Sequence, residues 1–186
     1  AAGSSREIDL RPFHVGLAND IAKETEHSVI VSATDAGALF RIDDEGHVTR
    51  VADGIVGANG LIVEGDEAFV VGLGPLGQQG DGHLFKVDLR TGARQELGDV
   101  RGRLDGIDRL PNGQLLVSDW VAIDTPTAGR FVAFDGSAAH PWSFGTAAVH
   151  GPADFLVSRR ASLVVIPRLL DGVVTIVPTA AAHGQE

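Results

Sequence analysis

The sequence GALFRID at residues 37–43 returns as GHLFKVD at 82–88, as GRFVAFD at 129–135 and, with more changes, as GVVTIVP at 172–178. The first residues of these phrases, at positions 37, 82, 129 and 172, are separated by 45, 47 and 43 positions. A repeat of this length is typical of proteins built from one recurring supersecondary unit. The chain is therefore expected to be an array of similar units.

Other apolar runs recur around each phrase. A run rich in β-branched residues precedes it, as in SVIVSATD at 28–35 and QLLVSDW at 114–120, and turn residues bound each run, which predicts strands. A third phrase lies earlier still (ANDIA, ANGLIV, LDGIDRL, PADFLV), and a turn with a fourth strand usually follows, as in DDEGHVTRVAD at 43–53. Four strands per unit at this spacing predict the blades of an all-β propeller.

The whole chain, residues 1–186, is expected to form a single propeller domain with antiparallel four-stranded blades near 14–54, 55–99, 100–146 and 147–180. A β-sandwich also alternates strands with turns, but it does not predict this repetition. The stretch ANDIAKETEH at 18–27 could look helical, although its place in the repeat favours strand, turn and strand. Residues 72–82, rich in Gly and Gln, predict a long loop in the second unit.

Composition excludes several classes of partner. The net charge of −10 and the lack of a basic run argue against nucleic acid. No stretch approaches the roughly 18–20 consecutive apolar residues of a membrane-spanning helix, so a soluble protein is expected. The chain has no cysteine and begins with Ala rather than Met. Its compartment therefore stays open among secreted, periplasmic and cytoplasmic.

A side-chain amide or carboxylate stands at the start of the first strand of every unit: Asn19, Asn59, Asp105 and Asp154. In a propeller this strand lines the central channel, so equivalent positions converge on the axis. Oxygen ligands of this kind suit a hard cation such as Ca²⁺. The pattern predicts a site for Ca²⁺ or another divalent cation, while the simpler alternative is that these residues form turns.

A second set of carboxylates, Asp43, Asp88 and Asp135, ends the third strand of its unit. These side chains are expected to cap turns rather than to contact a ligand. The triplet Pro-Asn-Gly at 111–113 separates two predicted strands and predicts a hairpin turn. Both sets are therefore left outside the predicted site.

Two histidines precede members of the predicted ring by four or five residues. His14 lies before Asn19 and His150 lies before Asp154, which places both on loops near the channel mouth. Histidine titrates near neutral pH, so either could accept a proton or bind a metal. His150 is taken as a catalytic candidate together with Asp105, with a solvated loop histidine as the alternative.

Three phrases also resemble motifs of the SMP-30/gluconolactonase/luciferin-regenerating-enzyme family, whose members are six-bladed propellers similar to paraoxonases: AND at 18–20, ANGL at 58–61 and LDGID at 104–108. The resemblance implies that Asn59 and Asp105 bind the metal and that Asp105 also acts as general base. It implies that Asn19 is a metal ligand or, with Asp20, a contact for a small-molecule substrate. The implied activity is hydrolysis of a lactone or related ester by a metal-activated water.

The sequence departs from that family in two respects. The family uses a Glu ligand from an early blade that this chain does not contain, and about four units are present where six are expected. The chain is therefore expected to be a fragment of a six-bladed propeller; the alternatives are a compact four-bladed propeller and a protein that covers its exposed blade edges by self-association. Two other functions stay open: a non-enzymatic binding platform resembling NHL repeats with at most a structural calcium, and a lyase or synthase resembling strictosidine synthase.

Overall fold

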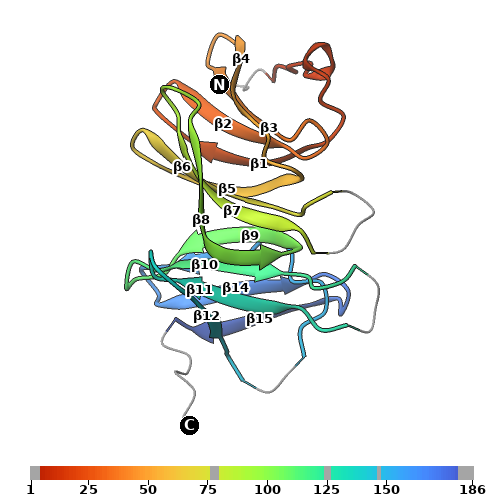
Figure 1. Ribbon diagram of the computed structural model, residues 1–186, viewed down its shortest axis with the longest axis vertical. Coiled ribbons are helices and arrows are strands. Elements are labelled where there is room, and N and C mark those ends of the chain that lie inside the picture. Colours follow the sequence, from red (N-terminus) through yellow and green to blue (C-terminus); the bar gives the residue numbers. More distant parts are fainter. Residues whose placement is uncertain (1–4, 76–79, 124–126, 146–147, 180–186) are drawn as a thin grey trace.

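The computed structural model describes residues 5–75, 80–123, 127–145 and 148–179, and these residues form an all-β propeller array. A short 3-10 helix, η1 (Arg11–Phe13), precedes the first blade. In Figure 1 the four sheets follow one another in chain order, and the first and last sheets lie at opposite ends of the array. The described ranges contain no helix of the length and apolarity needed to cross a membrane.

Consecutive strands form each sheet and pair antiparallel, so the predicted propeller fold is confirmed. The first three blades have four strands each, and the described part of blade 4 has three. Blade 1 contains β1 (Ala18–Lys23), β2 (Ser28–Ala33), β3 (Ala38–Asp43) and β4 (Val48–Asp53); blade 2 contains β5 (Ala58–Glu64), β6 (Glu67–Gly72), β7 (Gly82–Asp88) and β8 (Arg94–Gly102). Blade 3 contains β9 (Leu104–Arg109), β10 (Leu115–Asp119), β11 (Arg130–Phe134) and β12 (Ala139–Trp142); blade 4 contains β13 (Leu156–Ser158), β14 (Leu163–Arg168) and β15 (Val173–Pro178).

The repeated phrase forms the third strand of every blade, as the period predicts. The loop expected at 72–82 falls between β6 and β7, and its residues 76–79 lie outside the described part of the chain. Residues 18–27 form a strand and the start of a turn rather than a helix. The repeat was therefore the right guide where local composition was ambiguous.

The core lies between neighbouring blades because each sheet has two apolar faces. One cluster, with Ile30, Leu39 and Val70, joins blades 1 and 2. Similar clusters join blades 2 and 3 and blades 3 and 4. Burial of apolar surface stabilises proteins by about 25 cal/mol per Å². These three junctions therefore hold the array together.

The carboxylates that end the third strands cap turns, as predicted. Asp43 accepts the His47 backbone N–H at 2.8 Å, and Asp135 accepts those of Ser137 and Ala138, each at 2.8 Å. Backbone hydrogen bonds lower the pKa of both Asp43 and Asp135. The triplet at 111–113 forms the β9–β10 hairpin turn, where Gly113 has a φ of 88°.

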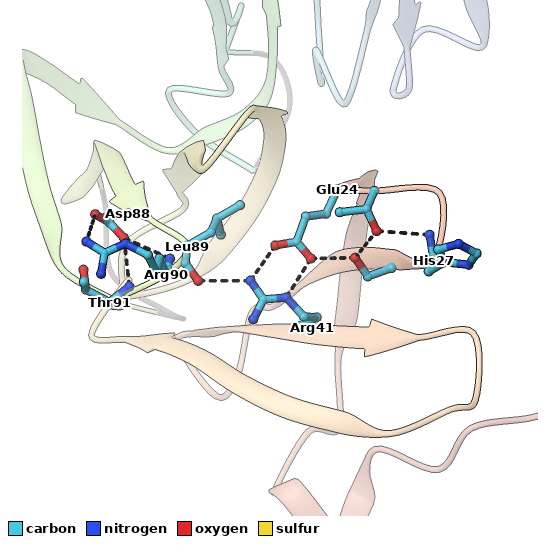
Figure 2. A network of polar contacts seen from close by, with 9 residues as sticks. Glu24, His27, Arg41, Asp88, Leu89, Arg90 and Thr91 are labelled. Atoms are coloured by element: carbon cyan, nitrogen blue, oxygen red, sulfur yellow. Dashed lines mark hydrogen bonds and ion pairs between the residues drawn. The ribbon is translucent and has the colours of Figure 1, made fainter.

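A polar bridge also joins blades 1 and 2 (Figure 2). The Arg41 guanidinium donates to the Glu24 carboxylate at 2.6 Å and to the backbone oxygen of Leu89, in blade 2, at 3.0 Å. The Glu24 side chain is 10% exposed, and its hydrogen bond with Arg41 lowers its pKa. The pair thus ties a mostly buried charge in blade 1 to the backbone of blade 2.

We expect Arg41→Met to destabilise the protein by about 2 kcal/mol at neutral pH, because Glu24 would be left ionised and mostly buried with no opposite charge, its remaining hydrogen bond being that from Ser28. The Glu24 pKa is lowered in the folded state, so its stabilising effect is present above the unfolded pKa of 4.5 and fades as the pH falls through the folded value. Urea unfolding across this pH range measures the effect. A penalty of equal size in acid would contradict it, and Arg41→Met with Glu24→Gln should recover part of the loss.

Candidate functional site

The innermost strand of each of the first three blades carries a β-bulge at its Asx residue. In blade 1, pairing passes from Ala18 with Ala33 to Ile21 with Val31, so one extra residue is accommodated in β1. The same interruption lies between residues 58 and 61 of β5 and between residues 104 and 107 of β9. Bulges redirect side chains and are frequent beside functional sites. Asn19, Asn59 and Asp105 therefore occupy equivalent places in the fold.

Asp154 is placed differently from these three. It precedes β13 rather than lying within an inner strand, and its Oδ1 accepts the Phe155 backbone N–H at 2.8 Å. Asp20 makes the same contact with the Ile21 N–H at 2.7 Å. A Cβ on Gly60 would lie 3.0 Å from Cα of Gly106, and one on Gly106 would lie 2.9 Å from Cα of Asp154, so Asp154 takes the place of Asp20, one position after the Asx residues of the three bulges.

Two glycines bring the inner strands close together. A Cβ added to Gly60 would lie 2.3 Å from the carbonyl oxygen of Asp105, and one added to Gly106 would lie 3.0 Å from Oδ1 of Asp154. Only a residue without a Cβ permits this approach. The Asn-Gly and Asp-Gly pairs thus place the polar residues of blades 2, 3 and 4 side by side.

Buried hydroxyl groups on the second strands support the bulges. Ser32 accepts the Asp20 N–H at 3.0 Å, and Ser118 accepts the Gly106 N–H at 2.8 Å. Thr34 donates to the Ala58 carbonyl at 2.8 Å and accepts the Asn19 carboxamide at 3.1 Å. The sequence prediction missed these groups. Their signal was the serine that recurs near the end of the second phrase in units 1 and 3.

Some side-chain oxygens of these inner residues accept hydrogen bonds within the protein, and others do not. Both oxygens of Asp20 accept backbone N–H groups, those of Ile21 and Leu61, each at 2.7 Å. Oδ2 of Asp105 accepts the indole N–H of Trp120 at 2.6 Å. Asp20 therefore holds β1 to β5, whereas Asp105 keeps Oδ1 available.

Each predicted metal ligand keeps such an oxygen. Within the described part of the chain, no hydrogen bond reaches the carbonyl oxygen of Asn19, the carboxamide of Asn59, Oδ1 of Asp105 or Oδ2 of Asp154. Asn59 is 2% exposed. Its side-chain oxygen and nitrogen are nevertheless not fully enclosed, so a ligand or water can reach them.

Negative charge accumulates at these positions. The pKa of Asp105 is raised from 3.8 to about 6, chiefly by burial and to a smaller extent by the carboxylates of Asp154 and Asp20, while the bond from Trp120 opposes the rise. Burial and the charge of Asp20 also raise the pKa of Asp154. A bound cation would relieve this repulsion.

The donor set would combine carboxylates with carboxamides. Among the described residues, no three His, Asp or Glu side chains lie close enough to hold a metal ion by themselves. The carboxamide oxygens of Asn19 and Asn59 would therefore have to complete any set that contains Asp105 and Asp154. Such an all-oxygen set fits Ca²⁺, which accepts amide oxygens and water along with carboxylates.

His150 is held by the last blade. Its Nδ1 lies 2.8 Å from Oδ1 of Asp171, whose pKa is lowered to about 2 chiefly by this contact. A Cβ on the adjacent Gly151 would lie 3.3 Å from the ring of Trp120, the residue that bonds Asp105. The ring of His150 thus has a fixed orientation, and the residue after it lies beside Trp120. His14 ends η1 with a φ of 61° and is exposed.

The fold is that of several solved β-propellers. A chain of a nidogen/laminin complex has a TM-score of 0.68 at 14% identity, with 88% of this chain and 61% of that chain covered. A gluconolactonase from Xanthomonas campestris has a TM-score of 0.63 at 17% identity, covering 89% and 63%. A streptogramin B lyase has a TM-score of 0.57 at 13% identity, covering 88% and 57%.

These likenesses establish the class of protein, a β-propeller, and nothing finer. The chain spans less than two thirds of the length of these three structures. No protein-family model matches the sequence, and the search of curated proteins gives no match either. Activity, substrate and partners are therefore matters for proposal.

Proposed function

We propose that this propeller is a divalent-metal-dependent hydrolase that acts on a lactone or a related ester, with Ca²⁺ held at the inner strands. The observation that carries the proposal is the group of side-chain oxygens that accept no hydrogen bond from the described residues, at Asn19, Asn59, Asp105 and Asp154. Two of these belong to carboxylates whose pKa is raised. The gluconolactonase likeness is consistent with the proposal but concerns the fold.

Each residue of the site would have a separate role. Asn59, Asp105 and Asp154 would hold the ion, and Asn19, which is exposed, would serve as a further ligand or contact the substrate. When bound, the ion would polarise the ester carbonyl and lower the pKa of a water. Trp120 fixes one oxygen of Asp105 and leaves the other to bind the ion. Asp20 is occupied by backbone contacts, so its role here is to position β5.

His150 would be the proton-transfer group. Its Nδ1 is oriented by Asp171, which leaves Nε2 to exchange a proton with substrate or water. This arrangement, a carboxylate that orients an imidazole, is a common way to fix the tautomer of a catalytic histidine.

The first test is calorimetric titration of chelator-treated protein with Ca²⁺. We expect Asn59→Ala to weaken binding at least about tenfold, or 1.4 kcal/mol. Asn112→Ala is the matched control, since Asn112 lies in an exposed hairpin and bonds only to Gln114 among the described residues. Equal affinity in the two variants would refute the metal site.

The second test is metal-dependent turnover of simple lactones. Turnover that requires added Ca²⁺ and falls in His150→Ala supports the hydrolase. Calcium binding without turnover would favour the alternative of a binding platform with a structural ion. The lack of a group of three carboxylate or histidine side chains in the described residues is the observation that favours this alternative.

A further inference from the structure

The two ends of the array expose positions that are buried inside it. Ile21 pairs with Val31 across β1 and β2 as Leu61 pairs with Val70 in blade 2 and Ile107 with Val117 in blade 3. Leu61 and Ile107 are 3% and 4% exposed because the preceding blade covers them, whereas Ile21 is 61% exposed. The inner part of the free face of blade 1 is therefore an uncovered half of a blade junction.

Blade 4 has a free face that forms the other half of such a blade junction. Leu156 pairs with Val165, and Val165 with Ile176, so these three lie in one row across the sheet. The exposed fractions of Leu156, Val174 and Ile176 are 59%, 63% and 61%. The opposite face of the same sheet, with Val164 and Ile166, is buried against blade 3.

This row matches the row that blade 1 turns towards blade 2. Gly60 approaches Gly106 and Gly106 approaches Asp154, so Asp154 follows them at the position that Asp20 holds in blade 1. Leu156 and Val165 therefore correspond to Ala22 and Ile30, which also pair. Ile30 is fully buried at its junction. The free face of blade 4 is thus of the kind that receives a following blade.

Blade 4 also has an edge that no strand of the described residues covers. In blades 1 to 3 a fourth strand pairs with the third, but no strand of the described residues pairs with the outer edge of β15. An open edge of this kind can accept a strand from another chain.

The N-terminal segment occupies the position of such a fourth strand, but it does so beside blade 1 rather than beside blade 4. At the β7–β8 turn, a Cβ on Gly92 would lie 2.3 Å from the carbonyl oxygen of Val51, in the outer strand of the preceding blade. At the corresponding turn of blade 1, a Cβ on Gly46 would lie 3.1 Å from the guanidinium of Arg6. Arg6 thus stands at blade 1 where β4 stands at blade 2.

Further contacts hold this segment in place. The Arg6 guanidinium donates to the carbonyl oxygens of Asp44 and Glu45 at 2.7 and 2.8 Å. Phe13 packs edge-on against Phe40 with ring centroids 5.9 Å apart. In blade 2, Phe85 pairs with Val70 as Phe40 pairs with Val31, and it packs in one cluster with Val51 of β4. The segment therefore covers blade 1 as an outer strand would.

We propose that two copies of this chain associate head to tail, so that the free face of blade 4 in one copy packs on the free face of blade 1 in the next. The N-terminal segment of the second copy would then lie beside β15 of the first as its fourth strand. This junction continues the one that the chain already forms three times, and it would extend the row of inner polar residues from Asp154 to Asn19 of the next copy. The inference does not depend on the proposed catalysis.

The contact joins two different surfaces, so head and tail variants are distinguishable. We expect the intact chain to sediment as an assembly of at least two copies, and Ile21→Asp and Ile176→Asp each to sediment as monomers. Val56→Asp is the matched control, since Val56 is 51% exposed in the β4–β5 connection, and it should leave the assembly unchanged. Circular dichroism verifies that each variant is folded.

An equimolar mixture of the two monomeric variants is the decisive sample. Each variant retains the contact face that the other has lost, so the mixture should form a two-chain species with one intact junction. A monomeric intact chain would overturn the proposal. So would dissociation of the Ile176→Asp variant alone, because that result indicates that two blade 4 faces meet.

Disulfide trapping tests the strand exchange, because the chain has no cysteine of its own. Arg6→Cys combined with Thr175→Cys or Ile176→Cys, which point to opposite faces of β15, should give chains linked to one another on a non-reducing gel. Persistent association without any linkage would refute the role of the N-terminal segment.

Discussion

Asp105→Asn is expected to change stability in opposite directions in the absence and presence of Ca²⁺. The pKa of Asp105 is raised from 3.8 to about 6, so its ionised form at pH 7 costs the folded protein up to about 3 kcal/mol. Asparagine removes this charge and still offers an oxygen to the indole of Trp120. The variant should therefore be more stable than the wild type by about 1–3 kcal/mol in chelator, and should lose the stabilisation that Ca²⁺ gives the wild type.

The pH dependence of this effect has a defined sign. Because the folded pKa of Asp105 lies above the unfolded value, the folded state binds more protons between pH 3.8 and about 6. The stability of the metal-free wild type should therefore fall relative to the variant as the pH rises through this window, and the difference should be constant above it. Urea unfolding in chelator at a series of pH values measures this.

Asp135→Asn provides the control for that experiment. Asp135 caps an exposed turn and its pKa is lowered, so its loss should destabilise the protein at neutral pH whether or not Ca²⁺ is present. If Asp105→Asn behaved in the same way, the carboxylate of Asp105 would be a structural group rather than a metal ligand whose ionised form is destabilised by burial.

The strands could be predicted from the sequence because each unit repeats the same local pattern of apolar and turn-forming residues. Each third strand carries alternating apolar residues between turn formers, and four occurrences fix its place in the unit. The turn roles of Asp43, Asp88 and Asp135 followed from the same local chemistry and are confirmed.

The finer arrangement of the site was not accessible in this way. A bulge adds a residue without altering the apolar pattern, so alignment of phrases could not show that Asp154 takes the place of Asp20. The contact of His150 with Asp171 joins residues 21 positions apart on different turns, which no local pattern encodes. Sequence therefore found the candidate ligands, whereas the fold decides which of their oxygens are free.

Gly60→Ala should be among the most damaging single substitutions in the chain. The backbone of Gly60 lies outside the left-handed region, so alanine adds no dihedral strain. Its Cβ would instead lie 2.3 Å from the carbonyl oxygen of Asp105, and a backbone atom in a neighbouring strand cannot move aside as a flexible side chain can. Overpacking of this kind costs about 3 kcal/mol or more when the clash is with backbone.

The same substitution should also weaken Ca²⁺ binding, because separation of β5 from β9 would draw Asn59 away from Asp105. Gly65→Ala is the matched control. Nothing lies within 4 Å of its Cβ position, so only its φ of 63° opposes alanine, at a cost of about 1 kcal/mol. Urea midpoints compare the two variants. Equal losses of stability would indicate that the Asn-Gly pair serves only as a turn. A much larger loss for Gly60→Ala would indicate that Gly60 is required for blade packing and that Asn59 beside it belongs to the site.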